Sequence, residues 1–584
     1  MSINISKLRK DTLIAKIDGI KEYLNTTKPN QEIEIWLNDI KNELCRQKYG
    51  LNFEEHQEKI DTLLETHIPL FTEDKELTIN KSDNWNFLLE GDNLASLNLL
   101  RKTHKEQIDY IYIDPPYNTK SKDFLYDDNF VEPTDLFKHS KWLSFMQKRL
   151  IIAHELLRDS GAIMLSINEE EVFGLKLLCD EIFGSHNYLA MFSVKVRHED
   201  RILKGDKDYH EVMEYLLVYR KTSDFRTIKR QVDNTSNVEY VYQIVEKTIT
   251  PEITIMDQKE VQIFKPGEYE IKKVEASTDN LKKINIRGSI KEGNSSGRFF
   301  MKHLNQFIGD KLGYLYKVPN MGDDKFGFRY FLIPENLKRA NGDYFQGVPI
   351  NRSDIKEVPY ANYLSVESCG MEEYLSLNYL DFEAQFNNVG KEGYVEFRNG
   401  KKPLAFLEKC FELGGVKDNK DAVVLDFFAG SGSTGHALMR LNAIDGGNRK
   451  FILCTNNESN ICRDVTYERI KLAIEKEDLD ESLKYYKVDY LDTIGKVYYE
   501  YADTLLAHIR ELIQLDDHIA IDDSGKIRVA LTDEEVEVLL NNNVQGLKLY
   551  LGYDVLLDSM SMQKLGKNWK FISRIPDVYY SNTK

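Results

Sequence analysis

Short apolar segments that alternate with amphipathic ones constrain the fold of this chain more than any other feature. The segment IDYIYID at 108–114 is almost continuously apolar or aromatic, and GAIMLSI at 161–167 is a second such run. Between them, residues 141–157 form an amphipathic stretch. Strands separated by a helix in this order are typical of a parallel sheet with crossover helices.

The same rhythm returns after a long interruption. A helix is expected over 403–413, then the apolar strand AVVLDFF at 422–428, the turn AGSGS, a helix from Thr434 and the strand KFILCTN at 450–456. From 191 to 395 the alternation is lost, because Gly, Asn, Asp and Lys are frequent and strand-like runs are short. We therefore expect a Rossmann-like α/β fold with a mostly parallel sheet, whose two halves flank an inserted α+β domain.

The length of 584 residues is well beyond one hydrophobic core and suggests about three or four units. Near the N-terminus, apolar residues recur at helical spacing, and such stripes serve core packing or a dimer contact. The expected segments are a helical N-terminal segment (1–75), a first α/β half (76–190), the insertion (191–395), a second α/β half (396–490) and a C-terminal domain (491–584).

Composition places the chain among ordinary globular proteins, with 42% hydrophobic and 30% charged residues. No apolar run approaches the about 18 residues that a membrane span needs, and the amphipathic N-terminus does not have the pattern of a secretory signal. Six scattered cysteines without a C-x-x-C pair fit reduced thiols. We expect a cytoplasmic protein with no membrane partner and no bound metal.

The net charge of −17 argues against a nucleic-acid partner only if the chain is treated as a whole. Phosphate contacts need just a local basic surface. One candidate surface lies where the insertion begins, and it comprises Lys195, Arg197, Arg201, Lys204 and Lys207. Because acidic residues are interleaved with these, a solvated face of mixed charge is the competing interpretation.

A glycine-rich turn follows Asp426 and opens the next helix. Glycines there let the backbone approach a ligand at the carboxyl edge of a parallel sheet. The spacing matches neither G-x-G-x-x-G nor a phosphate loop, so by itself the motif is equally a structural turn or a ligand loop. The next strand ends near Glu458, where a carboxylate either accepts from ribose hydroxyls or is a plain surface group.

The motif Asp114-Pro115-Pro116-Tyr117 ends the strand at 108–114. Two prolines fix the backbone and remove two N–H donors, which leaves carbonyl groups and the Asp114 carboxylate as a rigid set of acceptors. Such a set suits a neutral amino group, and the Tyr117 ring offers a face on which a base can stack. A lone four-residue match of this kind is better explained by a proline turn that ends a strand.

Taken together, the two motifs resemble those of DNA amino-methyltransferases. DPPY comes first, a long insertion follows and FAGSG comes last, which is the permuted order of the β group of these enzymes. The surrounding text is similar to the modification (Mod) subunits of Type III restriction-modification systems. The similar stretches are LLEGDNLASLNLL (88–100), DPPYNT (114–119), HSKWLSFMQKRL (139–150), KPLAFLEK (402–409) and VTYERI (465–470).

This resemblance implies roles for the motif residues. Asp114 and the Pro115 carbonyl would accept the two amino hydrogens of an adenine that stacks on Tyr117. A second set would contact the cofactor S-adenosylmethionine, and it comprises Lys402, Pro403, Asp426, Phe428, Gly430, Gly432, Ser433, Thr434 and Glu458. Of these, Lys402 and Pro403 match the segment that approaches the methionine carboxylate. Asp92 lies in a family-like stretch, where a helix cap is an equally good explanation.

The implied reaction is methyl transfer to adenine N6 in double-stranded DNA, with the base turned out of the duplex. The insertion at 191–395 would recognise the target sequence. The chain would act as a homodimer beside a separate restriction (helicase-nuclease) subunit. A stand-alone methyltransferase and a DNA-specificity protein without catalysis remain alternatives, as do cytosine N4 and RNA as targets.

Overall fold

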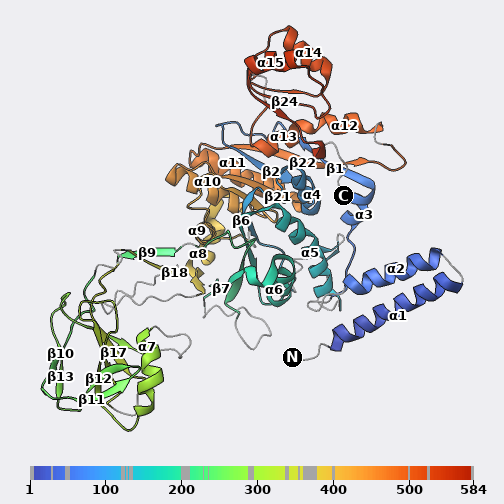
Figure 1. The fold of residues 1–584 in the computed structure, drawn as a ribbon. Coiled ribbons are helices and arrows are strands. Elements are labelled where there is room, and N and C mark those ends of the chain that lie inside the picture. Colours follow the sequence, from blue (N-terminus) through green and yellow to red (C-terminus); the bar gives the residue numbers. More distant parts are fainter. Residues whose placement is uncertain are drawn as a thin grey trace. The chain divides into compact units, whose positions relative to one another are not determined.

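The structure is a computed structural model of the 584-residue chain, and it divides into two compact units (Figure 1). The first unit comprises Met1–Ile228 and Asn362–Lys584, and the second comprises Lys229–Ala361. The described residues are 5–27, 31–46, 53–119, 125–126, 129–130, 136–198, 211–227, 229–233, 236–286, 295–335, 341–352, 355–359, 378–397, 401–497, 500–521 and 526–579.

The first unit is built on a ten-stranded sheet, in which parallel pairs predominate. From one edge to the other its strands are β1 (His67–Glu73), β22 (Ser482–Asp492), β2 (Trp85–Glu90), β21 (Lys450–Thr455), β20 (Val423–Asp426), β3 (Ile108–Ile113), β6 (Leu157–Ile167), β8 (Met213–Arg220), β7 (Tyr188–Lys195) and β19 (Tyr379–Asp381). All neighbours from β22 to β6 are parallel, whereas β1 and β8 run antiparallel to theirs. The expected mostly parallel α/β sheet is confirmed.

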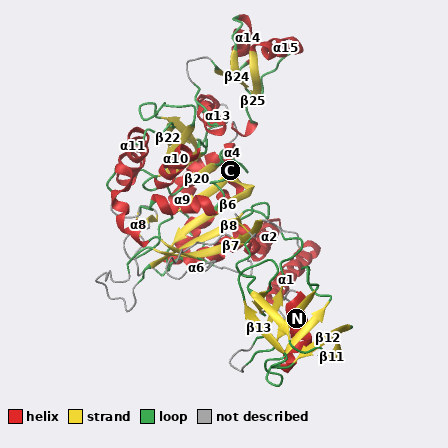
Figure 2. Cartoon of the chain, turned by 90° about the vertical axis from the view of Figure 1, so that its left-hand side faces the viewer, coloured by secondary structure: helices red, strands yellow, loops and turns green. Residues whose placement is uncertain are grey.

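Helices cover both faces of this sheet. Successive residues of a strand point to opposite faces, and the strands carry apolar side chains on both. Ile111 and Ile113 of β3 belong to one apolar cluster, and Tyr110 and Tyr112 belong to the other. The first cluster is completed by α4 (Asn93–Thr103), α5 (Lys138–Leu156), α6 (Val172–Cys179) and α13 (Ile509–Asp517). The second is completed by α9 (Leu404–Leu413), α10 (Ser433–Asp445) and α11 (Glu468–Lys476). Figure 2 shows the strands of this unit with helices on either side.

The strand order reverses direction between β20 and β3. From β20 the chain passes through α10 to β21 on one side, whereas from β3 it passes through α5 to β6 on the other. Val424 of β20 pairs in parallel with Tyr110 of β3, although the two strands are far apart in the sequence. Open α/β sheets bind ligands outside the carboxyl ends of the strands at such a switch point. Both sequence motifs follow these carboxyl ends.

The second unit, Lys229–Ala361, contains fewer residues than the stretch 191–395, in which the sequence shows no regular alternation of strands and helices. Strands β8 and β19 and most of β7 lie in that stretch but pair in the main sheet. Within the unit, an antiparallel sheet contains β11 (Glu252–Met256), β12 (Lys259–Phe264), β15 (Leu315–Pro319), β16 (Phe328–Leu332), β17 (Asp343–Gln346) and β14 (Lys282–Asn285). Two strand pairs accompany it, β10 (Tyr242–Glu246) with β13 (Tyr269–Lys273) and β9 (Lys229–Asp233) with β18 (Ile355–Pro359). The short helix α7 (Ser295–Phe299) adds aromatic rings to its core.

The described part of the N-terminal segment contains three helices up to residue 66, and residues 53–58 are not helical. Its helices are α1 (Ile5–Thr27), α2 (Gln31–Arg46) and α3 (Lys59–Thr66). The segment 67–73 is a strand instead, because it pairs with β22 at the edge of the sheet. No helix in the described part of the chain is long and apolar enough to cross a membrane.

The C-terminal segment forms a small α/β layer after α12 (Ala502–Ala507) and α13. Three parallel strands, β23 (Ile527–Ala530), β24 (Gly546–Leu551) and β25 (Trp569–Arg574), alternate with α14 (Asp533–Asn541) and α15 (Ser559–Asn568). Their apolar side chains make a separate core around Leu549, Leu551 and Trp569. The sequence predicted a C-terminal domain here but not this sheet.

Candidate active site

The DPPY turn leaves β3 at the switch point and is fixed from α5. The indole Nε1 of the fully buried Trp142 donates to the Pro116 carbonyl oxygen at 2.7 Å. Beyond the turn, Asn118 adopts a left-handed conformation (φ 57°), and its amide donates to the carboxylate of Glu171. The turn is therefore held from both sides before any ligand binds.

Asp114 and Tyr117 belong to a cluster of four polar side chains, of which Lys402 is buried and the other three are partly buried. The Tyr117 hydroxyl lies 2.8 Å from Asp114 Oδ1 and 2.9 Å from Glu214 Oε2, as a donor to these carboxylates. Lys402 Nζ donates to that hydroxyl oxygen at 2.6 Å. The same ammonium lies 3.1 Å from Asp114 Oδ1 and 2.9 Å from Glu214 Oε2. The cluster thus joins β3, β8 and the residue two before α9.

Burial sets the electrostatics of this cluster. The side chains of Lys402, Asp114 and Glu214 are only 7%, 17% and 14% exposed. Burial raises the pKa of Asp114; the Lys402 charge opposes the rise and Glu214 adds to it. Burial also disfavours the charged form of Lys402, but the two carboxylates outweigh this and raise its pKa. With all three ionised, one ammonium faces two carboxylates, so the cluster carries one excess negative charge.

Glu214 was missed by the sequence reasoning. It is a single acidic residue near the start of β8, and no local pattern in the sequence marks it. Lys402 was expected at the cofactor carboxylate, and the structure instead places its ammonium in the Asp114 cluster. Pro403 is the N-cap of α9, so Lys402 lies just before the helix starts. Which group Lys402 contacts when a cofactor is bound stays a prediction.

The glycine turn lies beside this cluster, at the end of β20. The buried carboxylate of Asp426 accepts from the Phe428 backbone N–H at 3.0 Å and from the Thr434 hydroxyl at 2.6 Å. Burial raises the pKa of Asp426 to about 7, despite these two hydrogen bonds. Gly430 and Gly432 have φ of 49° and 73°, a conformation that favours glycine. Asp426 thus ties both ends of the turn together.

The helix that follows is joined to α11 through the turn's serines. The guanidinium of Arg469, which is fully buried, donates to Ser433 Oγ at 2.6 Å and to Ser431 Oγ at 3.2 Å. The Ser433 hydroxyl is therefore already engaged by a buried guanidinium. Glu458 begins a short 3-10 helix (Glu458–Asn460) after β21 and is exposed, and its contact with ribose stays a prediction.

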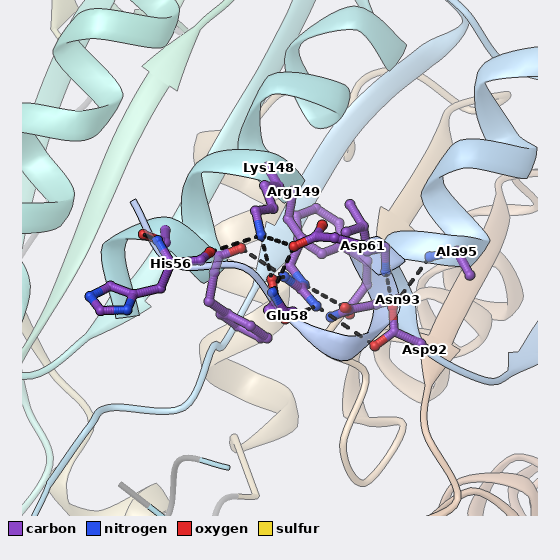
Figure 3. A network of polar contacts seen from close by, with 12 residues as sticks. His56, Glu58, Asp61, Asp92, Asn93, Ala95, Lys148 and Arg149 are labelled. Carbon is purple, nitrogen blue, oxygen red and sulfur yellow. Dashed lines mark hydrogen bonds and ion pairs between the residues drawn. The ribbon is translucent and has the colours of Figure 1, made fainter. Parts of the chain in front are cut away.

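The Phe427 carbonyl at the start of the turn is held by a polar network that includes Asn93 and Arg149. Figure 3 shows this network from Glu58 to Asp92. Asn93 Nδ2 donates to the Phe427 carbonyl oxygen at 2.9 Å, and Asn93 Oδ1 accepts from Arg149 Nε at 2.6 Å. The fully buried Arg149 is neutralised by Glu58, with N–O distances of 2.9 and 3.1 Å. Its neighbour Asp92 caps α4 by accepting from two backbone N–H groups. Of the two explanations left open for Asp92, the helix cap is thus observed.

Aromatic rings extend this support to the next residue of the turn. The Arg149 guanidinium lies 3.6 Å from the centre of the Phe145 ring, which packs on the Phe428 ring at 5.8 Å between centroids. Phe428 was predicted to line the cofactor. Its ring has a fixed orientation because α5 supports it from behind.

The predicted basic surface is only partly described. Lys195 forms an ion pair with Glu383 at 2.9 Å, and the Lys195 side chain is 14% exposed. Arg197 is exposed and donates to the Glu211 carbonyl oxygen at 2.9 Å. Arg201, Lys204 and Lys207 lie outside the described residues. Phosphate binding by these five residues stays a prediction, and Lys195 is the least available of those described.

Residues 108–466 match the family model of a DNA methylase, which covers more than half of the chain and both motifs. The chain belongs to this family. The resemblance to DNA amino-methyltransferases inferred from the two motifs is confirmed.

The chain is also similar in sequence to individual DNA-modification proteins. Over 414 residues it is 31% identical to the Type III restriction-modification enzyme StyLTI Mod subunit of Salmonella typhimurium, covering 66% of this chain and 54% of that protein. It is 27% identical over 553 residues to the EcoPI Mod subunit of Escherichia phage P1, covering 85% and 77%. It is 30% identical over 384 residues to the Type II methyltransferase M.KpnI of Klebsiella pneumoniae, covering 63% and 79%. The chain thus spans about half of the StyLTI subunit.

Proposed function

We propose that this chain transfers a methyl group from S-adenosylmethionine to adenine N6 at specific sites in DNA, as the modification subunit of a Type III restriction-modification system. The observation that carries the proposal is the adjacency of the two motifs. A rigid acceptor turn with a buried carboxylate and a glycine turn follow neighbouring parallel strands at the switch point.

The residues of the glycine turn fit the cofactor. A Cβ on Gly432 would lie 3.1 Å from Thr466 Cγ2, so the backbone there is packed from below, whereas a Cβ on Gly430 would have no neighbour closer than 3.8 Å. Gly430 thus leaves room for a ligand on its exposed side. The Phe428 ring would pack against the methionine part and the Glu458 carboxylate would accept from the ribose hydroxyls. Bound there, S-adenosylmethionine supplies an activated methyl group.

The chain's own residues then hold the substrate. Asp114 accepts one hydrogen of the adenine amino group and the Pro115 carbonyl accepts the other, which directs the nitrogen lone pair toward the methyl donor. The base is taken out of the duplex at a cost of a few kcal/mol, offset by stacking on Tyr117 and by these hydrogen bonds. The protein therefore acts by positioning and by excluding water, without a covalent intermediate.

Substitution of Asp114 tests the proposal. Asp114→Ala removes the acceptor and should abolish transfer of a tritiated methyl group to DNA, while equilibrium binding of S-adenosylhomocysteine stays near wild type. Asp159→Asn is the control, since this aspartate is exposed on β6. Transfer at the normal rate by Asp114→Ala would refute the assignment.

The target base and sequence come from a second measurement. Cytosine N4 carries an amino group of the same geometry, so adenine rests on the similarity to Mod subunits. Methylation-aware sequencing of DNA from cells that express the chain reports the base, the motif and the strand. Adenine methylation in a defined motif supports the proposal, and cytosine methylation replaces adenine as the target.

The second unit is the candidate for sequence recognition. Residues 229–361 contain 21 Lys and Arg against 18 Asp and Glu, whereas the whole chain carries a net charge of −17. A unit that is basic on an acidic chain suits contact with phosphates. Exchanging residues 229–361 for the matching unit of a relative should change the methylated motif without changing the methylated base.

Self-association and a separate restriction subunit complete the proposal. Helices α1 and α2 carry four exposed apolar side chains, which are Leu13 (46% exposed), Ile20 (48%), Trp36 (56%) and Ile40 (51%). Exposed apolar side chains of this kind suit contact with a second copy of the chain. Light scattering on the wild type and on Ile20→Glu would test this, with a monomeric wild type as the contrary result. A stand-alone methyltransferase is the remaining alternative, and a helicase-nuclease gene beside this one distinguishes the two.

A further inference from the structure

Glu214 lies outside both motifs, yet it contacts the same two groups as Asp114. Its Oε2 lies 2.9 Å from Lys402 Nζ and 2.9 Å from the Tyr117 hydroxyl. Asp114 Oδ1 lies 3.1 Å from that ammonium and 2.8 Å from that hydroxyl. The two carboxylates, from β8 and the end of β3, therefore share one cation and one hydroxyl hydrogen.

The sharing changes what Asp114 can do. A carboxylate paired with an ammonium of its own is neutralised and accepts a further hydrogen bond weakly. Lys402 is divided between two carboxylates, so with all three groups ionised the cluster carries one excess negative charge. The single hydrogen of the Tyr117 hydroxyl cannot satisfy both carboxylates at full strength, which leaves Asp114 a stronger acceptor than a simple ion pair would.

We propose that Glu214 is a positioning residue for the methyl transfer: by sharing Lys402 and the Tyr117 hydroxyl, it keeps Asp114 a basic acceptor for the substrate amino group and fixes the stacking ring. The inference rests on the proposed function and deepens it. Glu214 touches neither substrate nor cofactor in this role, because it acts through its two partners.

The groups that face Asp114 make the effect of Glu214 separable. Lys402 and Tyr117 contact it directly, while Glu214 of β8, Tyr112 of β3 and Asp426 of β20 interact with it electrostatically. Lys402 lowers the Asp114 pKa and Glu214 raises it. Removing the Glu214 charge leaves the other four groups unchanged, so the Asp114 pKa should fall.

The experiment measures single-turnover methyl transfer against pH in the full-length protein, because product release then does not mask the chemical step. Glu214→Gln keeps the shape and removes the charge. The plateau rate should fall about 10- to 100-fold, as expected when a reacting group is slightly misplaced. The acidic limb should move to lower pH, because a like charge near Asp114 is gone.

Two further variants make the result specific. Glu214→Asp retains the charge, so its acidic limb should stay near that of the wild type even where its plateau is lower. Glu155→Gln is the matched control, since the Glu155 carboxylate also pairs with a cation, Arg101, at 2.8 Å. It lies away from Asp114, because the main-chain carbonyl of Glu155 accepts from the Glu106 N–H at the opposite end of β3. This variant should leave the rate and the limb unchanged. Thermal unfolding and binding of S-adenosylhomocysteine confirm that each variant is folded.

An acidic limb that stays in place in Glu214→Gln would overturn the inference, and so would an equal shift in Glu155→Gln. A folded Glu214→Asp variant whose limb has moved as far as that of Glu214→Gln would also overturn it. A wild type that binds the cofactor product but transfers no methyl group to DNA refutes the proposed function instead, so the two failures are distinguishable.

Discussion

Replacing Lys402 by methionine tests the electrostatics of the site most directly. The Lys402 side chain is 7% exposed, and its ammonium lies 3.1 Å from Asp114 Oδ1 and 2.9 Å from Glu214 Oε2. Methionine has a similar length and no charge, so the variant leaves two buried carboxylates without their counter-ion. Removing one partner of a buried ion pair costs about 3–5 kcal/mol, because the other charge stays buried. At about 2 °C per kcal/mol for a large unit, the unfolding temperature should fall by about 6–10 °C.

The loss should depend on pH. Burial raises the pKa of Asp114 and Lys402 opposes that rise, so the folded-state pKa is higher still in the variant. A group with a raised folded-state pKa stabilises the fold at low pH and loses that contribution as the pH rises through this pKa. The deficit relative to wild type should therefore be smaller at acidic pH than at alkaline pH, and a range from about pH 5 to about pH 8 compares the two.

Differential scanning fluorimetry across this range measures the deficit. Lys401→Met is the matched control, because the adjacent lysine is also buried but donates to the main-chain carbonyls of Glu392 and Val395. Its unfolding temperature should change with pH as the wild type's does. A deficit of Lys402→Met that is the same at every pH would refute the reasoning, as would one below about 2 °C near about pH 8.

Three further changes probe the glycine turn. Asn93→Asp keeps the acceptor for Arg149 but turns a carboxylate toward the Phe427 carbonyl. The affinity for S-adenosylhomocysteine, measured by calorimetry, should therefore fall about 10-fold. Asn98→Asp, on the same helix, is the control and should not change this affinity. Gly432→Ala forces a side chain into φ 73° with its Cβ 3.1 Å from a threonine methyl group, at about 1–2 kcal/mol, and should weaken the same binding. Asp426→Asn removes a group whose pKa is raised from 3.8 to about 7, so its unfolding temperature should rise relative to wild type between these two pH values and stay level above them; a difference that does not change across this window would contradict the pKa shift.

Local features of the sequence determined the elements and their chemistry. The expected strand at 108–114 is Ile108–Ile113, and the expected strand at 450–456 is Lys450–Thr455. Such agreement is possible because apolar periodicity and turn residues act over a few positions. The two motifs likewise carry their chemistry in adjacent residues, and their order along the chain identified the family. The C-terminal sheet escaped prediction because its short strands lie among strongly helical stretches.

Only the tertiary structure decided which side chains meet. Glu214, Lys402 and Tyr117 are far apart in sequence, and no local pattern relates an acid at the start of one strand to a lysine before a distant helix. Parallel pairing of β20 with β3 and antiparallel pairing of β6 with β8 bring them together. The charge balance around Asp114, and hence its strength as an acceptor, is a property of that assembly, because burial and neighbouring charges exist only once the sheet has formed.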